Sequence, residues 1–395
     1  MEKNSVALQE VLTRQVEQIL PSRKGLESLM KQKKIRVYLG VDPTGKYLHL
    51  GHAIPLRKLQ RFADLGHEAI LVVGTGTVLA GDPSQRATVR PLIDQEEIRE
   101  NIKTWRKQAA RVLDFLMVKV RFNGSWLAKL QLPEIVHIAS NISAAQLFQR
   151  DMFQKRLSSG GTVWTHEILY PLLQGYDSVA LDVDLEIGGT DQLFNMLVGR
   201  ELQKKMRKRE KYVLCTPMLT GLDGRPMSKT SGNAVNILDE PQNMYGKIMS
   251  MKDELILHYF ELCTDIVLKE VQNLPARDAK ARLAKEIVSL YHGVGEAEKA
   301  EQEFNTVFQK RQIPSEIQGF AMEQLPMSST LTNLVCDIGF AHSKAEARRL
   351  IEQGGIKVDG KKIKDPTAVV QVRKGTVLQK GKRRFMEILY KNAPS

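Results

Sequence analysis

The sequence predicts an α/β fold: a Rossmann-like parallel sheet with a helical insertion, followed by a helical domain and a small C-terminal α+β domain. The first observation is a pair of strand-like runs, 37–41 and 68–74, on either side of an amphipathic helix at 53–66. This strand–helix–strand order implies parallel pairing. The second observation is helical periodicity through most of 94–178 and again through 241–308. The third is a return to short helical and strand-like runs near the C-terminus.

The chain has 395 residues, more than one hydrophobic core usually serves, so several domains are expected. A strand-like run at 181–187, a helix from about 191 and a last strand at 213–219 complete the predicted sheet. Pro314, Gly319 and Pro326 indicate a linker. The predicted parts are a Rossmann-like domain at 1–232 with its helical insertion at about 94–165, a helical domain at 233–312, the linker at 313–328 and a basic C-terminal domain at 329–395.

The composition predicts a cytoplasmic protein without a membrane segment. Hydrophobic residues make up 42% and charged residues 26%, which is ordinary for a globular protein. No apolar run approaches the roughly 20 residues of a membrane helix, and the acidic residues near the start argue against a targeting peptide. The three cysteines are scattered singly, so we expect neither disulfides nor a structural metal. They are Cys215, Cys263 and Cys336.

Positive charge is concentrated at the C-terminal end. The net charge is +13, and residues 328–395 hold 14 Lys or Arg against 6 Asp or Glu. A predicted helix and a predicted hairpin, whose turn is Asp359-Gly360, present bases on one side. With few aromatic residues between them, they suit the phosphates of structured RNA read largely by shape. The alternative is a merely soluble basic domain. The bases are Lys344, Arg348, Arg349, Lys357, Lys361 and Lys362.

Two histidines lie where the first strand leads into its helix. His49 and His52 are separated by Leu50 and Gly51, and the helical pattern starts directly after them. Free backbone N–H groups and the helix dipole attract anions at such a point. Imidazole donors beside a glycine that admits close approach would suit a polyphosphate. The alternative is that the histidines only cap or pack the helix.

A polar face is predicted on a mostly apolar helix. Tyr170, Gln174 and Asp177 are spaced i, i+4 and i+7, so they share one side. A solvated face is the usual reading of such a stripe. Here the neighbouring positions are apolar, and buried polar groups need partners, which a polar ligand can supply. Pro171 interrupts the pattern and predicts a kink.

Two further segments suggest nucleotide chemistry. Asp191 follows Gly188-Gly189 at the carboxyl end of a predicted strand, where ligands of α/β proteins bind. It could accept from a ribose hydroxyl or serve as a helix N-cap. The Gly-rich, basic run 221–233 is typical of a mobile loop that brings a cation onto phosphates, or of a plain exposed loop.

In this order and at these intervals, the combination resembles the class I aminoacyl-tRNA synthetases, specifically the bacterial-type tyrosyl-tRNA synthetases. Residues 49–52, HLGH, resemble the family's HIGH signature, and 226–230, PMSKT, its KMSKS loop. The runs at 40–44 and 81–84, the polar helix face and GGTDQ at 188–192 also match. The terminal domain is similar to the small RNA-binding module of a ribosomal protein. Tryptophanyl relatives share the two signatures but lack the polar face and this basic tail.

The resemblance implies a role for individual residues of this sequence. The phenol of tyrosine would lie at Tyr38 and Asp177. Its α-ammonium group would lie at Asp82, Tyr170 and Gln174. The adenylate would rest on Gly40, Asp42, Asp191 and Gln192, with Gly51 beside the ATP. The ATP phosphates would meet Thr44, His49 and His52, and the mobile loop would supply Lys229 and Thr230.

The implied reaction joins L-tyrosine to the 3′ end of tRNA(Tyr) through a tyrosyl-adenylate. ATP is a substrate, Mg²⁺ arrives with it, and no metal ligands are expected in the protein. The resemblance also implies a homodimer through the helical insertion. Three positions depart from the family pattern. Pro226 replaces the first signature lysine, with Arg225 as a candidate substitute, and Leu39 and Pro55 stand where some members contact ribose.

Three other readings remain at the level of sequence. A tryptophanyl-type synthetase would share both signatures, and a non-catalytic RNA-binding relative would explain Pro226. A nucleotide-binding oxidoreductase is suggested by Gly74-Thr75-Gly76 after a strand. The spacing from there to Gly81 misses the glycine pattern of dinucleotide-binding folds, and no acidic residue follows at the right strand end.

Overall fold

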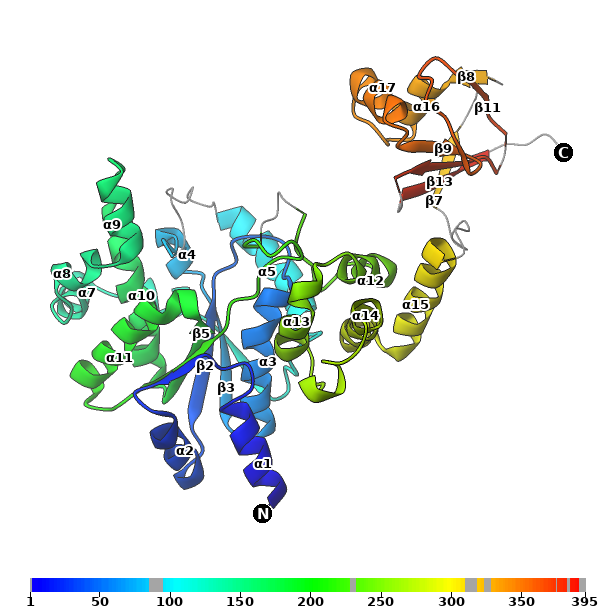
Figure 1. Cartoon of the computed structure of the whole chain (residues 1–395). Coiled ribbons are helices and arrows are strands. Elements are labelled where there is room, and N and C mark those ends of the chain that lie inside the picture. The colour runs from blue at the N-terminus through cyan, green and yellow to red at the C-terminus, as the bar shows by residue number, and fades with distance from the viewer. Residues whose placement is uncertain are drawn as a thin grey trace. The chain divides into compact units, whose positions relative to one another are not determined.

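The structure is a computed structural model that describes residues 2–84, 95–227, 232–309, 318–322, 328–373, 375–381 and 384–390. The chain forms two compact units, Met1–Ala300 and Glu301–Ser395. The first unit contains the large sheet (Figure 1), and the second contains a smaller one.

The first unit is built on a six-stranded sheet in the order β1-β6-β5-β2-β3-β4. Neighbours from β6 through β4 pair in parallel, whereas β1 pairs antiparallel with β6. The predicted parallel sheet is therefore confirmed, with one antiparallel edge strand that the periodicity did not reveal. The strands are β1 (Gln18–Leu20), β2 (Arg36–Val41), β3 (Glu68–Val73), β4 (Val118–Phe122), β5 (Leu185–Gly189) and β6 (Tyr212–Thr216).

Helices cover both faces of this sheet. Helix α3 (Leu50–Asp64) lies on one side, and α10 (Thr165–Leu181) and α11 (Leu193–Arg207) lie on the other (Figure 1). The remaining helices before residue 208 are α1 (Glu2–Val11), α2 (Arg23–Gln32), α4 (Thr77–Ala80), α5 (Gln95–Ala109), α6 (Gly124–Leu127), α7 (Leu132–Ala139), α8 (Ala144–Phe148) and α9 (Asp151–Ser158). A 3₁₀ turn, η1 (Thr190–Gln192), precedes α11.

The predicted βαβ unit is confirmed. Strand β2 pairs in parallel with β3, and α3 packs on both through a buried stripe that includes Leu56, Leu59 and Phe62. The helix begins at Leu50, three residues before the predicted start, because His49 already serves as its N-cap. Helix α10 continues without a break through Pro171. It also reaches Leu181, so β5 begins later than the sequence suggested.

One strand lies inside the stretch that periodicity assigned mostly to helices. Residues Val118–Phe122 form β4, which pairs in parallel with β3 at the edge of the sheet. Only Val118 of this strand is fully buried, as expected for a short edge strand. A run of only five residues between long helical patterns shows too little alternation of apolar and polar residues to be recognised as a strand.

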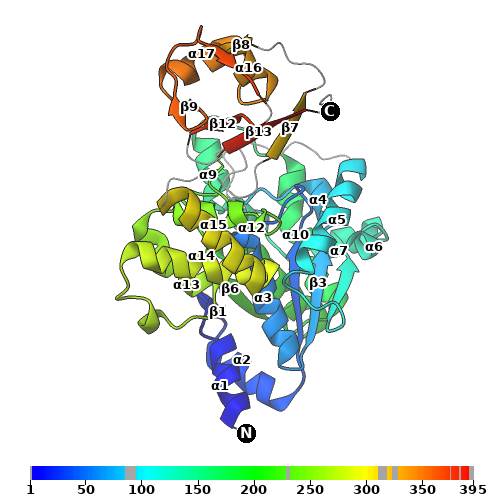
Figure 2. The same cartoon turned by 90° about the vertical axis from the view of Figure 1, so that its right-hand side faces the viewer.

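A group of helices follows the sheet. Helices α12 and α13 both pack on α14 (Figure 2). Their buried side chains include Met244, Tyr259, Leu283 and Ile287. The elements are α12 (Pro241–Met249), η2 (Asp253–Leu255), α13 (Ile256–Cys263), η3 (Leu268–Glu270), α14 (Ala276–His292) and α15 (Val294–Gln309).

The described part of the second unit combines two short helices with strands that pair mostly antiparallel. Its five-stranded sheet has the order β10-β9-β12-β13-β7, and β11 pairs with β8. The core includes Leu334, Val335, Ile351 and Leu378. The elements are β7 (Gln318–Met322), β8 (Ser328–Thr330), α16 (Leu331–Asp337), α17 (Lys344–Glu352), β9 (Ile356–Val358), β10 (Lys361–Lys362), β11 (Val369–Gln371), β12 (Val377–Lys380) and β13 (Arg384–Tyr390).

The second unit contains the predicted hairpin, whereas a strand lies within the predicted linker. The Asp359-Gly360 turn joins β9 to β10 with φ angles of 46° and 78°, which confirms the predicted hairpin. The predicted linker 313–328 differs from expectation, because its residues 318–322 form β7 and pair in parallel with β13. Residues 313–317 and 323–327 lie outside the described residues.

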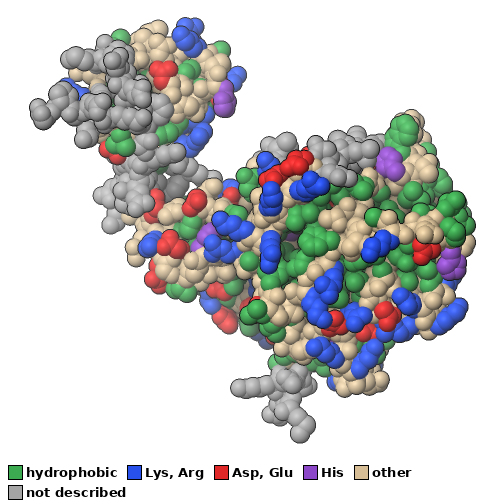
Figure 3. Space-filling view, turned by 180° about the vertical axis from the view of Figure 1, so that it is seen from behind, with side chains coloured by type: hydrophobic (Ala, Val, Ile, Leu, Met, Phe, Trp, Pro, Cys, Tyr) green, Lys and Arg blue, Asp and Glu red, His purple; other side chains and the backbone are tan. Residues whose placement is uncertain are grey.

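The described residues contain neither a helix suited to crossing a membrane nor a group of candidate metal ligands. No helix there is both long enough and apolar enough to cross a membrane. The same residues bring no three His, Cys, Asp or Glu side chains together as metal ligands. On the face that Figure 3 shows, Lys and Arg side chains, with acidic ones among them, are spread over the described parts of both units.

Lys58 of α3 is a buried base that joins two helices of the first unit. Its side chain is fully buried, and Nζ donates to the carbonyl oxygens of Val11, 2.8 Å away, and Arg14, 2.5 Å away. Burial lowers the pKa of Lys58 from 10.5 to about 7. Between these values the unfolded chain holds a proton on Lys58 that the folded chain has lost, so raising the pH favours folding.

We therefore expect the free energy of unfolding to increase from pH 7 to 10, relative to a Lys58→Met variant, by on the order of 4 kcal/mol. Urea unfolding of both proteins across this range measures the difference. Lys31→Met, which removes an exposed lysine of α2, should leave the pH dependence unchanged. A stability difference between wild type and Lys58→Met that stays constant with pH would contradict the expectation.

Candidate active site

A cavity of about 1310 Å³ lies in the first unit at the carboxyl ends of the parallel strands. The segments after β2, β3 and β5 all contribute to its wall. Ligands of open α/β sheets bind at this edge. Most of the residues proposed from the sequence line the cavity. They are Gly40, Asp42, Thr44, His49, Gly51, His52, Asp82, Tyr170, Gln174, Asp177, Asp191 and Gln192.

The three polar residues of α10 face this cavity together, as their spacing predicted. Asp177 is 2% exposed and accepts from Asn123 Nδ2 at 3.0 Å and from Trp126 Nε1 at 2.8 Å. Burial raises the pKa of the Asp177 carboxyl to about 8, although both donors oppose the shift. The carboxyl group is therefore held in place by two donors from the segment after β4.

Tyr38 lies behind the cavity wall and is not one of its lining residues. Its side chain is fully buried, and its hydroxyl is 3.0 Å from Ser178 Oγ. Burial, with the negative charges of Glu186 and Asp177 nearby, raises the pKa of the Tyr38 phenol well above its usual value. The hydroxyl therefore stays protonated and belongs to a buried polar network that continues to Lys211.

Two acidic groups stand beside Tyr170 and Gln192. The Tyr170 hydroxyl donates to Asp42 Oδ2 at 2.9 Å, and Thr77 Oγ1 donates to Asp42 Oδ1 at 2.7 Å. Gly74 is required here, because a Cβ on it would lie 1.8 Å from Asp42 Oδ1.

Asp82 is held in a similar way. Its Oδ2 accepts from Gln192 Nε2 at 2.8 Å, and its Oδ1 accepts from the Ser84 amide at 2.9 Å. With Asp42, this wall of the cavity is rich in carboxylate oxygens and suits a cationic group.

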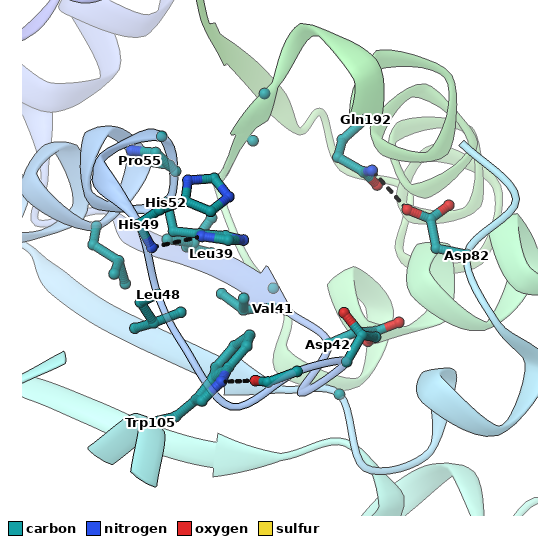
Figure 4. A pocket seen from close by; sticks show the side chains of 18 of the residues that line it. Leu39, Val41, Asp42, Leu48, His49, His52, Pro55, Asp82, Trp105 and Gln192 are labelled. Carbon is teal, nitrogen blue, oxygen red and sulfur yellow. Dashed lines mark hydrogen bonds between the residues drawn. The ribbon is translucent and has the colours of Figure 1, made fainter. Parts of the chain in front are cut away.

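The two histidines occupy another side of the cavity, away from the Asp82–Gln192 pair (Figure 4). His49 is the N-cap of α3, its amide donates to His52 Nδ1 at 3.2 Å, and the ring centroids are 3.8 Å apart. A Cβ on Gly51 would lie 3.1 Å from the His49 ring. Capping and cavity lining, which the sequence left as alternatives, therefore occur together.

Asp191 lies in η1 rather than at the helix N-cap, which is Gln192. Its Oδ2 accepts from Gln192 Nε2 at 3.0 Å. Burial raises the pKa of Asp191. The alternative that Asp191 is the N-cap is therefore wrong. The N-cap is the next residue, because the chain makes a 3₁₀ turn before the α-helix begins.

The glycine-rich loop reaches the cavity through its described part. Pro226 and Met227 line the cavity. Arg225, the candidate substitute for the missing lysine, forms an ion pair with Asp223 at 2.9 Å and keeps 78% of its side chain exposed. Lys229 and Thr230, both proposed from the sequence, lie outside the described residues.

The six bases proposed for RNA contact lie on α17 and the β9–β10 hairpin. Five of them are exposed, and Lys357 is half-buried. The hairpin packs close to the end of α17, since a Cβ on Gly354 would lie 2.0 Å from Lys362 Cε. Lys362 of the hairpin and the end of α17 therefore lie side by side within the second unit.

Sequence reasoning missed the residues that hold the polar side of the cavity in place. They are Asn123, which lines the cavity itself, and, behind the lining, Trp126, Ser178, Glu186 and Lys211. Glu186 did leave a signal, because an acid in the middle of a predicted strand needs a partner if the strand is buried. The partners of Asp177 left none, because they follow β4, which the periodicity did not identify.

Comparison with known families agrees with this architecture. The model of the family described as tRNA synthetases class I (W and Y) matches residues 30–309. The S4 domain model matches residues 330–373, within the second unit. Among solved structures, a truncated mitochondrial tyrosyl-tRNA synthetase of Aspergillus nidulans has a TM-score of 0.65. At 21% identity, over 78% of this chain and 99% of that one, it supports the fold alone.

Relatives of nearly equal length are more similar in sequence. Tyrosine–tRNA ligase of Thermotoga maritima is 41% identical over 388 residues, which is 96% of both chains. Tyrosine–tRNA ligase of Moorella thermoacetica is 41% identical over 392 residues, covering 96% of this chain and 94% of the relative. Because the family model spans most of the chain and the relatives span nearly all of it, the chain belongs to the class I tRNA synthetases of the tryptophan and tyrosine type.

Proposed function

We propose that the chain is a tyrosine–tRNA ligase, which activates L-tyrosine with ATP and transfers it to the 3′ end of tRNA(Tyr). The observation that carries the proposal is one cavity that joins the histidine motif to the polar face of α10. The names of the full-length relatives support tyrosine as the amino acid. They do not favour the tryptophanyl alternative.

Tyrosine would bind with its phenol at Asp177 and its α-ammonium group at the acidic wall. Asp177 has its two oxygens fixed by Asn123 and Trp126 and can accept a further hydrogen bond from a phenol. Tyr38, behind the cavity lining, would support the phenol site through the contact of its hydroxyl with Ser178 of α10. Asp82, Tyr170 and Gln174 would surround the ammonium group, because carboxylate and amide oxygens accept its three N–H donors.

ATP would bind with its phosphates at the start of α3. His49, His52 and Thr44 line this side, and the helix dipole favours negative charge there. Mg²⁺ would enter with the nucleotide as part of the substrate. Gly40, Gly51, Asp42, Asp191 and Gln192 would hold the rest of the nucleotide, and Lys229 and Thr230 would reach the phosphates from the loop.

Catalysis then depends on positioning and charge stabilisation, without a protein nucleophile. A tyrosine carboxylate oxygen attacks the α-phosphorus, the bond to the bridging oxygen breaks, and pyrophosphate leaves. A terminal hydroxyl of the tRNA next attacks the carbonyl carbon of the adenylate, and AMP leaves. Histidine and lysine donors at the phosphates would bind most strongly as charge builds on them in the first step.

The S4 domain would bind tRNA through the basic surface of α17 and the β9–β10 hairpin. We also propose a cytoplasmic homodimer that uses the helical insertion. Helix α7 exposes several large apolar side chains, including Leu132, Ile135 and Val136, which a second copy could cover.

The proposed activity is tested by tyrosine-dependent ATP–pyrophosphate exchange, with tryptophan and phenylalanine as controls. We expect exchange with tyrosine alone. Lys229→Ala should slow exchange by about 100-fold, because a phosphate contact made in the transition state is lost. Its dissociation constant for tyrosine should stay within about twofold of the wild-type value. Exchange with tryptophan instead of tyrosine would refute the proposal, and a large loss of tyrosine binding would refute the role of Lys229.

Asp177→Asn should reduce the preference for tyrosine over phenylalanine by at least about tenfold in kcat/KM. Asparagine has a single oxygen, so Asn123, Trp126 or the phenol hydroxyl would face its NH₂ instead of an acceptor, whereas phenylalanine brings no hydroxyl to the site. Steady-state exchange kinetics with both amino acids measure the ratio. Asp182→Asn, at the C-cap of the same helix with a side chain 46% exposed, is the matched control. An unchanged ratio in Asp177→Asn would remove this residue from the phenol site.

Replacing Arg348 and Arg349 with Glu should raise the KM for tRNA by at least about tenfold and leave exchange unchanged. The two side chains are exposed on α17, so their charge reversal acts on RNA contact rather than on folding. Aminoacylation measured at two salt concentrations tests this expectation. Arg23→Glu with Lys24→Glu, an adjacent exposed pair on α2, is the control. Equal effects of the two double variants would indicate nonspecific charge repulsion.

A further inference from the structure

A buried ion pair behind the cavity takes no part in the proposed reaction. We propose that Glu186, held by Lys211, is a positioning residue that turns the Gln174 amide so that its oxygen faces the amino group of the substrate. The inference rests on the proposed function, because it concerns recognition of the amino acid in the same cavity.

Glu186 and Lys211 come from neighbouring strands. Glu186 lies in β5 and is 1% exposed, and Lys211, directly before β6, is fully buried. Lys211 Nζ forms an ion pair with Glu186 Oε2 and donates to Ser178 Oγ at 2.8 Å. The parallel pairing of β5 with β6 places these two side chains together, away from the cavity lining.

The other carboxylate oxygen of the pair determines the orientation of Gln174. Gln174 Nε2 donates to Glu186 Oε1 at 3.0 Å. An ionised carboxylate only accepts hydrogen bonds, so it can face the NH₂ of an amide but not its oxygen. The two orientations of an amide have almost the same shape, so packing alone does not choose between them.

The consequence appears on the cavity side of Gln174. Its Oε1 is buried and has no hydrogen-bond partner among the described residues, while the side chain lines the cavity. A buried acceptor without a partner is costly, and a ligand that donates an N–H would satisfy it. An ammonium group fits this requirement. The reversed amide would present NH₂ and repel the same group.

Glu186→Gln tests the idea because it should reverse the Gln174 amide. Lys211 still needs an acceptor, so residue 186 would turn its oxygen toward Lys211 and its NH₂ toward Gln174. Gln174 would then offer its oxygen to residue 186 and its NH₂ to the cavity. The variant should bind ligands with an ammonium group poorly, while ligands without one should be unaffected.

Calorimetry gives dissociation constants for L-tyrosine and for 3-(4-hydroxyphenyl)propionate, which lacks the amino group. Comparing the two constants separates a lost ammonium contact from a general loss of binding. For Glu186→Gln the tyrosine-to-propionate ratio of dissociation constants should rise by at least about tenfold. In exchange kinetics the KM for tyrosine should rise, with kcat and the KM for ATP nearly unchanged. Tyramine, which keeps the amino group, should follow tyrosine.

Two further variants keep the test decisive. Asp184→Asn is the matched control, because this buried acid stands just before β5 and pairs with Lys33 and Arg209, away from the cavity. Its ratio should stay within about twofold of wild type. If Glu186→Gln does not fold, Glu186→Gln with Lys211→Met removes both charges and leaves the amide undirected. This double variant should raise the ratio by at least about threefold.

A ratio that stays at the wild-type value in the folded Glu186 variants would overturn the proposal, whether both constants rise together or neither changes. A parallel rise would mean that the ion pair only supports the fold. Failure of the proposed function is distinguishable, because wild-type protein would then show no tyrosine-dependent exchange. A normal wild type with an unchanged ratio in the variants would leave the function intact and refute the role of Glu186 alone.

Discussion

The parallel pairing of β2 with β3 and β5 is the constraint on which the rest of the site depends. It aligns Val37 with both Ala69 and Leu185. Three strands therefore end at one edge of the sheet, and the chain leaves each of them with a polar segment. Because the cavity opens at that edge, the histidine motif, Asp42 and Asp191 meet although they are far apart in sequence. A change of register would move each of these groups by at least one residue step of about 3.3 Å.

The site is divided into two regions of different charge. Carboxylates gather beside Tyr170 and Gln192, where a cation fits. The histidines and the helix N-terminus lie on another side, where phosphates fit. Both regions are held by groups that are already hydrogen-bonded in the protein, so little reorganisation is needed when a substrate arrives. This separation is suited to a reaction in which an amino acid meets a nucleotide between two prearranged surfaces.

Several elements and the central residues of the site follow from local sequence patterns. The βαβ unit, the polar face of α10 and the Asp359-Gly360 hairpin each arise from spacing within a few residues, so periodicity reveals them. Strand β4 was not predicted because it is short and lies between helical patterns. Strand β7 was not predicted because it pairs with β13, more than sixty residues further along the chain, and no local sequence pattern reveals such a pairing.

The sequence by itself determined which side chains stand on one helix face or at one strand end, because backbone geometry alone decides those positions. Only the tertiary structure decided what stands behind them. Asn123 and Trp126 reach Asp177 through the placement of β4, and Lys211 reaches Glu186 through the pairing of β5 with β6. These contacts depend on strand order and register across the whole sheet. The physical reason is that a buried polar group requires a partner but does not specify which distant residue supplies it.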